Sequence, residues 1–526
     1  MYKIILLLLL YIFYLEANAT TYYVAKNGND NNVGNQIMPW LSIQKAGATL
    51  QAGDTVYIKA GVYNERVEVI NTGMLNSPIV FVNYANDEVI LDGTGITWGS
   101  WGGLLDISSK NYIEINGLQI KNATSGGFWA EDASYIVIKN CKTYNTFSSG
   151  IGIWNCSNVT IFNNTIELAC NGGEQECITV SNSSYVNVYK NEVYNNGGGA
   201  GGGEGIDVKQ GSHDVNIYQN NVHDLNNRVG IYADAWDAHT YNIEIYANKI
   251  YRCTETAIAV ASEHGGLIEY VKVYNNLCFK NKYDGIQLGG WTTPSYQGAT
   301  PVKHIIIINN TCVKNGSINN GFGFGITVDN LYAEDITIRN NILSHNSAQM
   351  EIKSIATIPT IDHNLIDGFN GTQYARFGVD SIVGTPSFLD VNNDNYQISA
   401  TSLAVDNGNS SLAPLVDFSG GPRPYGASVD IGAYENNPST NTLNLHKKAV
   451  KIYPNPTSEY IYIELEKYIN YFVVEIYSLD GKKIMEWKNQ TKISLSYLKS
   501  GIYLVKVKTK KEELLSEKVI ITSKKK

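Results

Sequence analysis

A short unit of two β-strands recurs along the chain and constrains its fold more than any other feature. The first strand of the unit is apolar or aromatic and leads into an Asn, as in YVNVYKNEVY, DVNIYQNNVH and NIEIYANKIY. The copies align on Asn116, Asn140, Asn164, Asn191, Asn220, Asn248, Asn276, Asn310 and Asn341. A repeat of this kind indicates a solenoid in which each copy forms one coil.

A second strand keeps the same period. Its copies begin at Gly150, Cys177, Gly205, Gly230, Ala257, Gly285, Gly325 and Gln349. Stacked coils place equivalent residues about 4.8 Å apart, so the aligned Asn amides can form a ladder and the Ile and Val side chains can fill the interior. With 48 Gly, 36 Tyr and only 12 Pro, the composition also favours β-structure. We therefore predict an all-β chain built on a parallel β-helix.

These repeats resemble the right-handed parallel β-helix proteins of the pectate-lyase-like superfamily, many of which are secreted polysaccharide lyases and hydrolases. The opening segment is similar to the start of such proteins, and Ser42–Leu50 resembles their short capping helix, with Ser42 as its N-cap. The segment VDFSGGPRPYGASVDIGAYE resembles the tail that follows such solenoids, and we expect it to be a terminal cap. The resemblance implies a β-helix over residues 20–435.

The two ends of the chain resemble export signals. Residues 1–19 combine Lys3, an apolar run and Ala17-Asn18-Ala19, as a cleaved secretory signal does. After a polar linker at residues 436–446, residues 447–526 alternate in the manner of a small β-sandwich. Their YPNPTS, DGKKI and LKSGIYLVKV blocks resemble the C-terminal sorting domain of the Bacteroidota type IX secretion system. We expect this domain to engage that machinery, and the protein to be secreted or attached to the cell surface.

The net charge of −9 divides unevenly between these regions. From Lys447 onward there are 17 Lys and 9 acidic residues, a charge of +8, so the remainder of the chain carries −17. An acidic body argues against nucleic acid as a partner and weakly against a polyanionic substrate that is not bridged by cations. We expect a monomer. Of the seven cysteines, Cys170 and Cys177 flank an Asn-Gly-Gly loop and form the one pair that could be a disulfide.

The second strand carries the candidate chemistry. In the pattern G-I-x-V-x, the two x positions face outward. The outward positions of adjacent coils, together with the residues just beyond the strands, hold Asp207, Lys209, Tyr232, Asp234, Asp237, Glu263 and His264, with Trp236 and Trp291 at the rim. Because an ordinary solenoid face needs only Thr, Ser or Asn at such places, this concentration predicts a functional site.

A polysaccharide lyase is our first hypothesis for this site. The resemblance implies a Lys or Arg base beside calcium bound by aspartates. Lys209 would be the base, Tyr232 or His264 would donate a proton, and Asp207, Asp234 and Asp237 would bind Ca²⁺. Neighbouring carboxylates, however, raise the pKa of a lysine, which opposes its use as a base. The chain also lacks the NSDDGWDL-like calcium motif of the pectate lyase family nearest in architecture.

Two other functions remain open. A glycoside hydrolase would use Asp234 and Glu263 as its two carboxylates. A non-catalytic glycan-binding adhesin would need only an aromatic face. For an enzyme, we expect the polysaccharide to contact Arg228, Trp236, Gln287 and Trp291, although Arg228 could instead form a structural ion pair with Asp224.

Overall fold

The computed structural model describes residues 19–437 and 450–521, except for residues 100, 174, 199–200, 292–295, 317–322, 354–356, 369–375 and 377 in the first range and 454–456, 458, 466–471, 479–482, 496, 500 and 509–512 in the second. The chain divides into two compact units, residues 1–436 and 437–526. The predicted signal segment and most of the linker lie outside the described residues. Among the residues that are described, no helix has the length and apolar character needed to cross a membrane.

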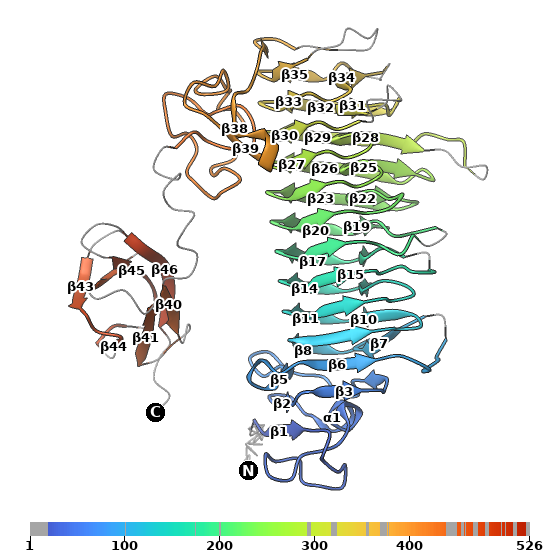
Figure 1. Ribbon diagram of the computed structural model, residues 1–526, viewed down its shortest axis with the longest axis vertical. Helices are drawn as coiled ribbons and strands as arrows, with labels where there is room; N and C mark the ends of the chain where they lie inside the picture. Colours follow the sequence, from blue (N-terminus) through green and yellow to red (C-terminus); the bar gives the residue numbers. More distant parts are fainter. Residues whose placement is uncertain are drawn as a thin grey trace, which may run out of the picture. The chain divides into compact units, whose positions relative to one another are not determined.

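The first unit is a solenoid of three long parallel sheets, whose strands follow one another around each coil (Figure 1). Sheet A contains β1 (Thr21–Val24), β2 (Thr55–Ile58), β5 (Ile79–Asn83), β8 (Asn111–Asn116), β11 (Ser134–Lys139), β14 (Ser157–Phe162), β17 (Ser184–Tyr189), β20 (His213–Tyr218), β23 (His239–Tyr246), β26 (Leu267–Tyr274), β29 (Val302–Ile308), β32 (Ala333–Arg339) and β35 (Thr360–Asp362). Sheet B contains β3 (Gly61–Tyr63), β6 (Val89–Asp92), β9 (Leu118–Lys121), β12 (Lys142–Tyr144), β15 (Thr165–Glu167), β18 (Glu192–Tyr194), β21 (Asn221–His223), β24 (Lys249–Tyr251), β27 (Leu277–Phe279), β30 (Thr311–Val313), β33 (Ile342–Ser344), β36 (Leu365–Asp367) and β37 (Ile382–Val383). Sheet C contains β4 (Val67–Glu68), β7 (Gly103–Asp106), β10 (Gly126–Glu131), β13 (Ile151–Trp154), β16 (Ile178–Ser181), β19 (Ile206–Lys209), β22 (Ile231–Ala235), β25 (Ile258–Glu263), β28 (Ile286–Trp291), β31 (Phe324–Val328) and β34 (Ala348–Ile352). The predicted parallel β-helix is confirmed.

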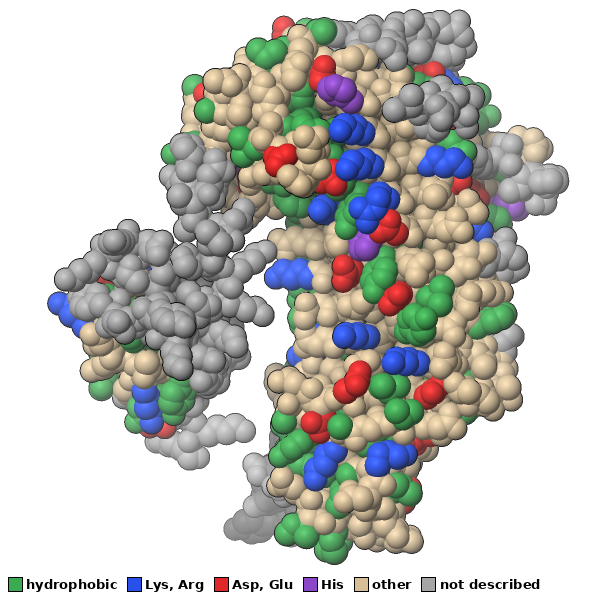
Figure 2. Space-filling model, viewed as in Figure 1, with side chains coloured by type: hydrophobic (Ala, Val, Ile, Leu, Met, Phe, Trp, Pro, Cys, Tyr) green, Lys and Arg blue, Asp and Glu red, His purple; other side chains and the backbone are tan. Residues whose placement is uncertain are grey.

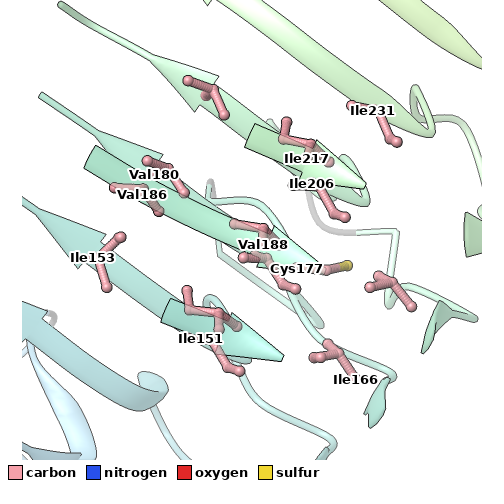
Figure 3. Packing of buried hydrophobic residues seen from close by; sticks show 14 of the residues in the cluster. Ile151, Ile153, Ile166, Cys177, Val180, Val186, Val188, Ile206, Ile217 and Ile231 are labelled. Atoms are coloured by element: carbon pink, nitrogen blue, oxygen red, sulfur yellow. The ribbon is translucent and has the colours of Figure 1, made fainter. Parts of the chain in front are cut away.

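The interior of the solenoid is a column of aliphatic side chains. Figure 3 shows Ile151 and Ile153 side by side on β13, with Val180 of β16 and Ile206 of β19 on the strands that follow, and all four are fully buried. This stacking follows from the register, because each strand pairs with the equivalent strand of the next coil. The opposite faces of the same strands therefore form continuous outward rows.

An asparagine ladder closes the corner between sheets A and B. The amide of Asn220 donates to Asn248 Oδ1 at 3.0 Å, and that of Asn248 donates to Asn276 Oδ1 at 3.0 Å. The buried ladder consists of Asn164, Asn191, Asn220, Asn248, Asn276, Asn310, Asn341 and Asn364. The sequence alignment was wrong at two positions, since Asn116 and Asn140 bond to each other outside this ladder. It also missed Asn364.

Polar and aromatic side chains cover the outside of the coils. On the face drawn in Figure 2, basic and acidic side chains stand beside one another along the stack of coils. Tyr189, Tyr218 and Tyr246 stack at centroid distances of 4.7 and 4.9 Å, and His223 stacks between Tyr194 and Tyr251. Regular stacking of this kind stabilises the register between coils.

The N-terminal end of the solenoid carries the predicted helix, α1 (Ile43–Thr49). Ser42 is its N-cap and accepts a hydrogen bond from the Lys45 N–H at 3.1 Å. A short 3₁₀ turn, η1 (Tyr84–Asn86), follows β5. Ile43 and Ala46 are fully buried in the interior cluster, so the helix covers the end of the apolar column.

The segment after the last coil, residues 387–436 (the tail), covers the side of the solenoid and not its end. It contains β38 (Phe388–Asp390), η2 (Val391–Asn393) and β39 (Asn395–Ile398). Tyr396 packs with Phe279 of sheet B, and Ile398 packs with Ile342 and Leu365. All three residues of β27, β30 and β33 are therefore buried. The expectation of a terminal cap was wrong, because the tail's apolar residues match the outer face of sheet B.

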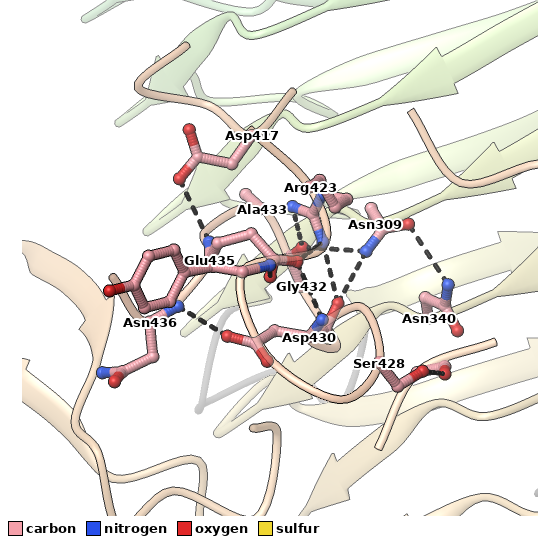
Figure 4. A network of polar contacts seen from close by, with 12 residues as sticks. Asn309, Asn340, Asp417, Arg423, Ser428, Asp430, Gly432, Ala433, Glu435 and Asn436 are labelled. Carbon is pink, nitrogen blue, oxygen red and sulfur yellow. Dashed lines mark hydrogen bonds and ion pairs between the residues drawn. The ribbon is translucent and has the colours of Figure 1, made fainter. Parts of the chain in front are cut away.

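A network of buried charged and polar groups holds the tail against the solenoid (Figure 4). Arg423 pairs with Glu435 at 2.9 Å and donates to the carbonyls of Asp430 and Gly432. Asn309 of the solenoid donates to the same two carbonyls at 2.9 and 3.1 Å. The tail is thus joined to the coils by hydrogen bonds as well as by apolar packing.

The second unit is a small sandwich, as predicted. One antiparallel sheet contains β40 (Val450–Tyr453), β41 (Tyr460–Leu465) and β44 (Lys492–Ser494). The other contains β43 (Lys483–Lys488), β42 (Val473–Tyr477), β45 (Gly501–Lys508) and β46 (Glu513–Ile521). Ile461 and Ile493 of the first sheet share one buried cluster with Val474 and Val505 of the second.

Candidate functional site

The candidate site lies on the outward face of sheet C. The register places Thr179, Asp207, Tyr232 and Ala259 in one row across β16, β19, β22 and β25. The row beside it holds Ser181 and Lys209 and, one strand further, Asp234. Both outward rows predicted from the repeat are confirmed. We call the following residues the sheet C cluster: Glu176, Glu204, Asp207, Lys209, Arg228, Tyr232, Asp234 and Glu263.

Lys209 lies at the centre of this cluster. Its ammonium donates to Glu176 Oε1 at 2.5 Å and lies 3.7 Å from Asp207 Oδ2. Burial acts to lower the pKa of Lys209, but the carboxylates of Glu176 and Asp207 outweigh burial and raise it. Lys209 is therefore a fixed cation, and the objection to it as a base is strengthened.

The carboxyl groups of the cluster hold protons more tightly than ordinary acids. Burial raises the pKa of Asp207 and that of Asp234 well above the usual range, with repulsion from Glu176 and Glu263, respectively, acting in the same direction. Burial and the charge of Glu176 raise the pKa of Glu204 to about 7. Asp207 Oδ1 and Asp234 Oδ1 are buried and have no hydrogen-bond partner among the described residues. The cluster is thus acidic and incompletely satisfied.

Tyr232 and Glu263 form the upper part of the cluster. The Tyr232 hydroxyl, on β22, donates to Glu263 Oε1 at the end of β25. Burial, with the charges of Asp234 and Glu263, raises the pKa of Tyr232 well above its usual value. Tyr232 thus remains a neutral hydrogen-bond donor and orients the Glu263 carboxylate.

An aromatic pair that includes Trp236, one of the two tryptophans expected at the rim, borders the cluster. Trp236 stacks on His264 at a centroid distance of 4.4 Å, and His264 lies 5.9 Å from Tyr296. His264 has a φ of +46°, at the turn before Gly265. The side chain of Trp291 lies outside the described residues.

Several predicted site residues lie outside the cluster or have other partners. Gln287 donates to Asp329 at 3.1 Å, two strands beyond Tyr232. The predicted pair of Arg228 with Asp224 is wrong, because Asp224 binds Arg252, while Arg228 lies 3.6 Å from Glu204.

The predicted calcium ligands do not form a ready site. Asp237 is exposed, whereas Asp207 and Asp234 are buried. Among the described residues, no group of three or more His, Cys, Asp and Glu side chains could hold a metal ion. The Lys209 ammonium instead lies between the carboxylates of Glu176 and Asp207. The arrangement therefore does not fit calcium.

Two acids of the cluster were missed by sequence reasoning. Glu176 comes directly before Cys177 and Glu204 directly before Gly205, at the last position of the loop that leads into sheet C. Asp284, before Gly285, occupies the same position, and burial raises its pKa to about 7. An acidic residue directly before the opening residue of the strand was the available signal.

The cysteines are structural. All seven are buried free thiols, including Cys170 and Cys177. Burial raises the pKa of Cys170 well above the usual value for a thiol, so these side chains behave as core residues.

Comparison with known proteins extends this description. Residues 22–341 match the family described as "Pel9A-like, right handed beta helix region", and residues 451–522 match the secretion system C-terminal sorting domain. The sorting domain indicates export, to the cell surface or the medium.

Two curated relatives share part of the sequence. The uncharacterised protein YwoF of Bacillus subtilis is 27% identical over 393 residues, which are 66% of this chain and 81% of YwoF. Pectate lyase PEL9 of Emericella nidulans is 28% identical over 144 residues, which are 25% of this chain and 35% of PEL9.

Among solved structures, the complex of XylC with xylose resembles this chain with a TM-score of 0.55 at 13% identity. The match covers 79% of this chain and 98% of XylC. At that identity, the likeness shows a shared fold and nothing more.

Proposed function

We propose, given that the chain belongs to the Pel9A-like right-handed β-helix family, that it is an exported enzyme that cleaves a polysaccharide at the sheet C cluster by hydrolysis. The observation that carries this proposal is the pair of acids Asp234 and Glu263. Burial and the charge of Glu263 raise the pKa of Asp234, while Glu263 accepts a hydrogen bond from Tyr232. The two carboxyl groups thus lie on neighbouring strands in different surroundings, since Asp234 is buried and Glu263 is bonded to Tyr232.

The division of roles follows from these environments. Asp234, whose pKa is raised by burial, would donate its proton to the glycosidic oxygen as the bond between that oxygen and the anomeric carbon breaks. Glu263 would take a proton from the water that attacks the anomeric carbon. Tyr232 would hold the Glu263 carboxylate in place, and Lys209 would balance the charge of Glu176 and Asp207. Each step uses a group of this chain alone.

The proposal is tested on a panel of neutral and acidic polysaccharides. We expect new reducing ends without the ultraviolet absorbance of an unsaturated uronate. Asp234→Asn and Glu263→Gln should each lower the rate by at least about a hundredfold. Asp329→Asn and Glu351→Gln are matched controls, because Asp329 directly follows β31 of sheet C, Glu351 lies on β34 of the same sheet, and burial raises the pKa of each. Equal losses in the controls, or silence across the panel, would overturn the proposal.

A lyase is the second candidate, and the family match favours it, since one relative is a pectate lyase. In that reaction Lys209 would remove a proton beside a uronate carboxylate, after losing its own proton and its pairing with Glu176. Reducing ends accompanied by the ultraviolet absorbance of a new double bond, and lost in Lys209→Met, would establish this alternative and exclude hydrolysis.

A further inference from the structure

Three tryptophans gather on sheet C beside the sheet C cluster. The rings of Trp129 on β10 and Trp154 on β13 stack at a centroid distance of 3.7 Å. Trp101, just before β7, lies 4.8 Å from Trp129 and 5.0 Å from Trp154, at interplanar angles of 80° and 58°. Trp129 and Trp154 are 1% and 7% exposed, but Trp101 is 47% exposed. We call these three residues the tryptophan platform.

The surrounding sequence makes room for the platform. A Cβ added to Gly152 would come within 2.2 Å of the Trp154 ring, and one added to Gly126 would come within 2.4 Å of the Trp129 ring. Both glycines lie in or beside the strands that carry the rings. Sheet C thus has glycines at the positions where a side chain would clash with the indole rings. The packing of the platform therefore depends on the sequence of the sheet itself.

The platform is aligned with Lys209 of the sheet C cluster. In the strand register, Trp154 pairs with Ser181, and Ser181 pairs with Lys209. Two strand steps correspond to about 10 Å. A short oligosaccharide that extends along the stack of coils from Lys209 would therefore reach the platform.

The polar groups at the platform indicate which sugar it would take. The Trp101 Nε1–H donates to Glu131 at 2.7 Å. Arg66 lies beside the platform, but it is paired with Asp106 at 3.1 Å and with Glu68. Acidic groups thus outnumber the single cation, which disfavours a uronate. Aromatic rings bind the apolar faces of neutral pyranoses, and acidic neighbours accept hydrogen bonds from their hydroxyls.

One indole of the platform, Trp129, and the nearby Trp98 each have an unused hydrogen-bond donor. The Nε1 atoms of Trp129 and Trp98 are buried and have no acceptor among the described residues. Buried donors of this kind are normally satisfied by protein, water or ligand. Their presence beside an exposed indole is an independent sign of a binding surface.

We infer that the tryptophan platform is a subsite for a neutral pyranose of the polysaccharide that is cleaved at the sheet C cluster. The inference rests on the proposed function for the identity of the bound chain. Trp101 supplies the stacking surface, and Trp129 and Trp154 hold it in position. The platform determines specificity and takes no part in bond breaking.

The test separates binding from catalysis. Affinities for neutral hexasaccharides of glucose, xylose, mannose and galactose, and for an oligogalacturonate, are measured by calorimetry on the full-length Glu263→Gln variant, with and without Trp101→Ala. We expect Trp101→Ala to weaken binding of a neutral hexasaccharide about tenfold. In the active enzyme, the same change should raise KM about tenfold and leave kcat within about twofold.

Two further variants control for folding. Trp101→Phe keeps an aromatic ring and should restore most of the affinity. Tyr135→Ala removes an aromatic residue that is 45% exposed on sheet A and should leave affinity unchanged. Thermal unfolding of each variant shows whether the platform remains folded.

The outcomes distinguish this inference from the proposed function. Unchanged affinity in folded Trp101→Ala, or tighter binding of oligogalacturonate than of every neutral oligosaccharide, would overturn the inference, even if the enzyme hydrolyses its substrate. Binding that depends on Trp101 in a chain that cleaves nothing would support the subsite and overturn the proposed function.

Discussion

The molecule buries charge in two places, and they are built differently. In the tail, Arg423 and Glu435 are paired, and the carboxylates accept backbone N–H groups: Glu435 accepts from Asp430 and Tyr425, and Asp430 accepts from Asp406 and Asn436. In the sheet C cluster, by contrast, the carboxyl groups of Asp207 and Asp234 each keep a buried oxygen without a partner among the described residues, whereas in the tail the atom left without one is Arg423 Nε, which is not part of a carboxyl group.

This difference separates a structural network from a reactive one. Backbone N–H groups donate hydrogen bonds to the tail carboxylates in the folded state. That network therefore has a structural role, which is to hold the tail on the solenoid. In the sheet C cluster, five carboxyl groups accompany two cations, and burial raises the pKa of Asp207, Asp234 and Glu204. Carboxyl groups that have a raised pKa and keep a buried oxygen without a partner are candidates for acid–base chemistry.

The largest effect should come from Asp234→Asn, which tests whether the sheet C cluster is reactive. We expect the rate of polysaccharide cleavage to fall between about a hundredfold and ten-thousandfold. The folded state should be unchanged or slightly more stable, because the substitution removes a buried carboxyl group that has an unpaired oxygen. Rates and urea unfolding midpoints check both expectations. A large loss of stability would place Asp234 among structural residues.

Arg423→Met tests the structural role of the buried charge network in the tail. Removal of the buried cation leaves Glu435 without its partner, so we expect a loss of about 3–5 kcal/mol in the free energy of unfolding of the coils that the tail covers. The cleavage rate per folded molecule should not change. Arg252→Met is the control, since its pair with Asp224 is nearly half exposed and should contribute less than about 1 kcal/mol. Urea unfolding and hydrogen exchange measure the loss, and equal effects of the two substitutions would contradict the comparison.

Glu204→Gln should have a smaller effect, on the pH dependence of the free energy of unfolding. The pKa of Glu204 is raised from 4.5 to about 7 in the folded chain, so the folded state binds this proton more tightly than the unfolded state. Its contribution to stability is complete below pH 4.5 and is lost as pH rises toward about 7, by at most about 3 kcal/mol. Unfolding midpoints across this range should fall less in Glu204→Gln than in the wild type. Identical slopes would show that the Glu204 carboxyl group is not perturbed.

The repeat in the sequence was sufficient to predict the coils, because side-chain alternation and register are local properties. The outward row Thr179, Asp207 and Tyr232 follows from counting two residues along each strand, and the structure confirms it. The tail escaped prediction, because its position depends on the match between Tyr396 and Ile398 and the outer face of sheet B.

The partners within the site could not be predicted in the same way. Glu176 reaches Lys209 across 33 residues, through a loop whose length varies between coils. The outward position of Trp154 follows from the repeat, but its stacking on Trp129 and Trp101 depends on the absence of a side chain at Gly152. The sequence identifies which residues face outward, whereas the conformations of the loops determine which of these side chains contact one another.

The smallest effect should follow removal of metal ions. We expect EDTA to change the cleavage rate of the wild type less than about twofold, because the Lys209 ammonium lies between the carboxylates of Glu176 and Asp207. Lys209→Met removes that ammonium and leaves a group of carboxylates suited to a hard cation. Calcium should therefore raise the unfolding temperature of Lys209→Met and leave that of the wild type unchanged. Loss of wild-type activity in EDTA, restored by calcium, would show instead that Lys209 gives way to a metal ion and that the lyase chemistry expected from the family applies.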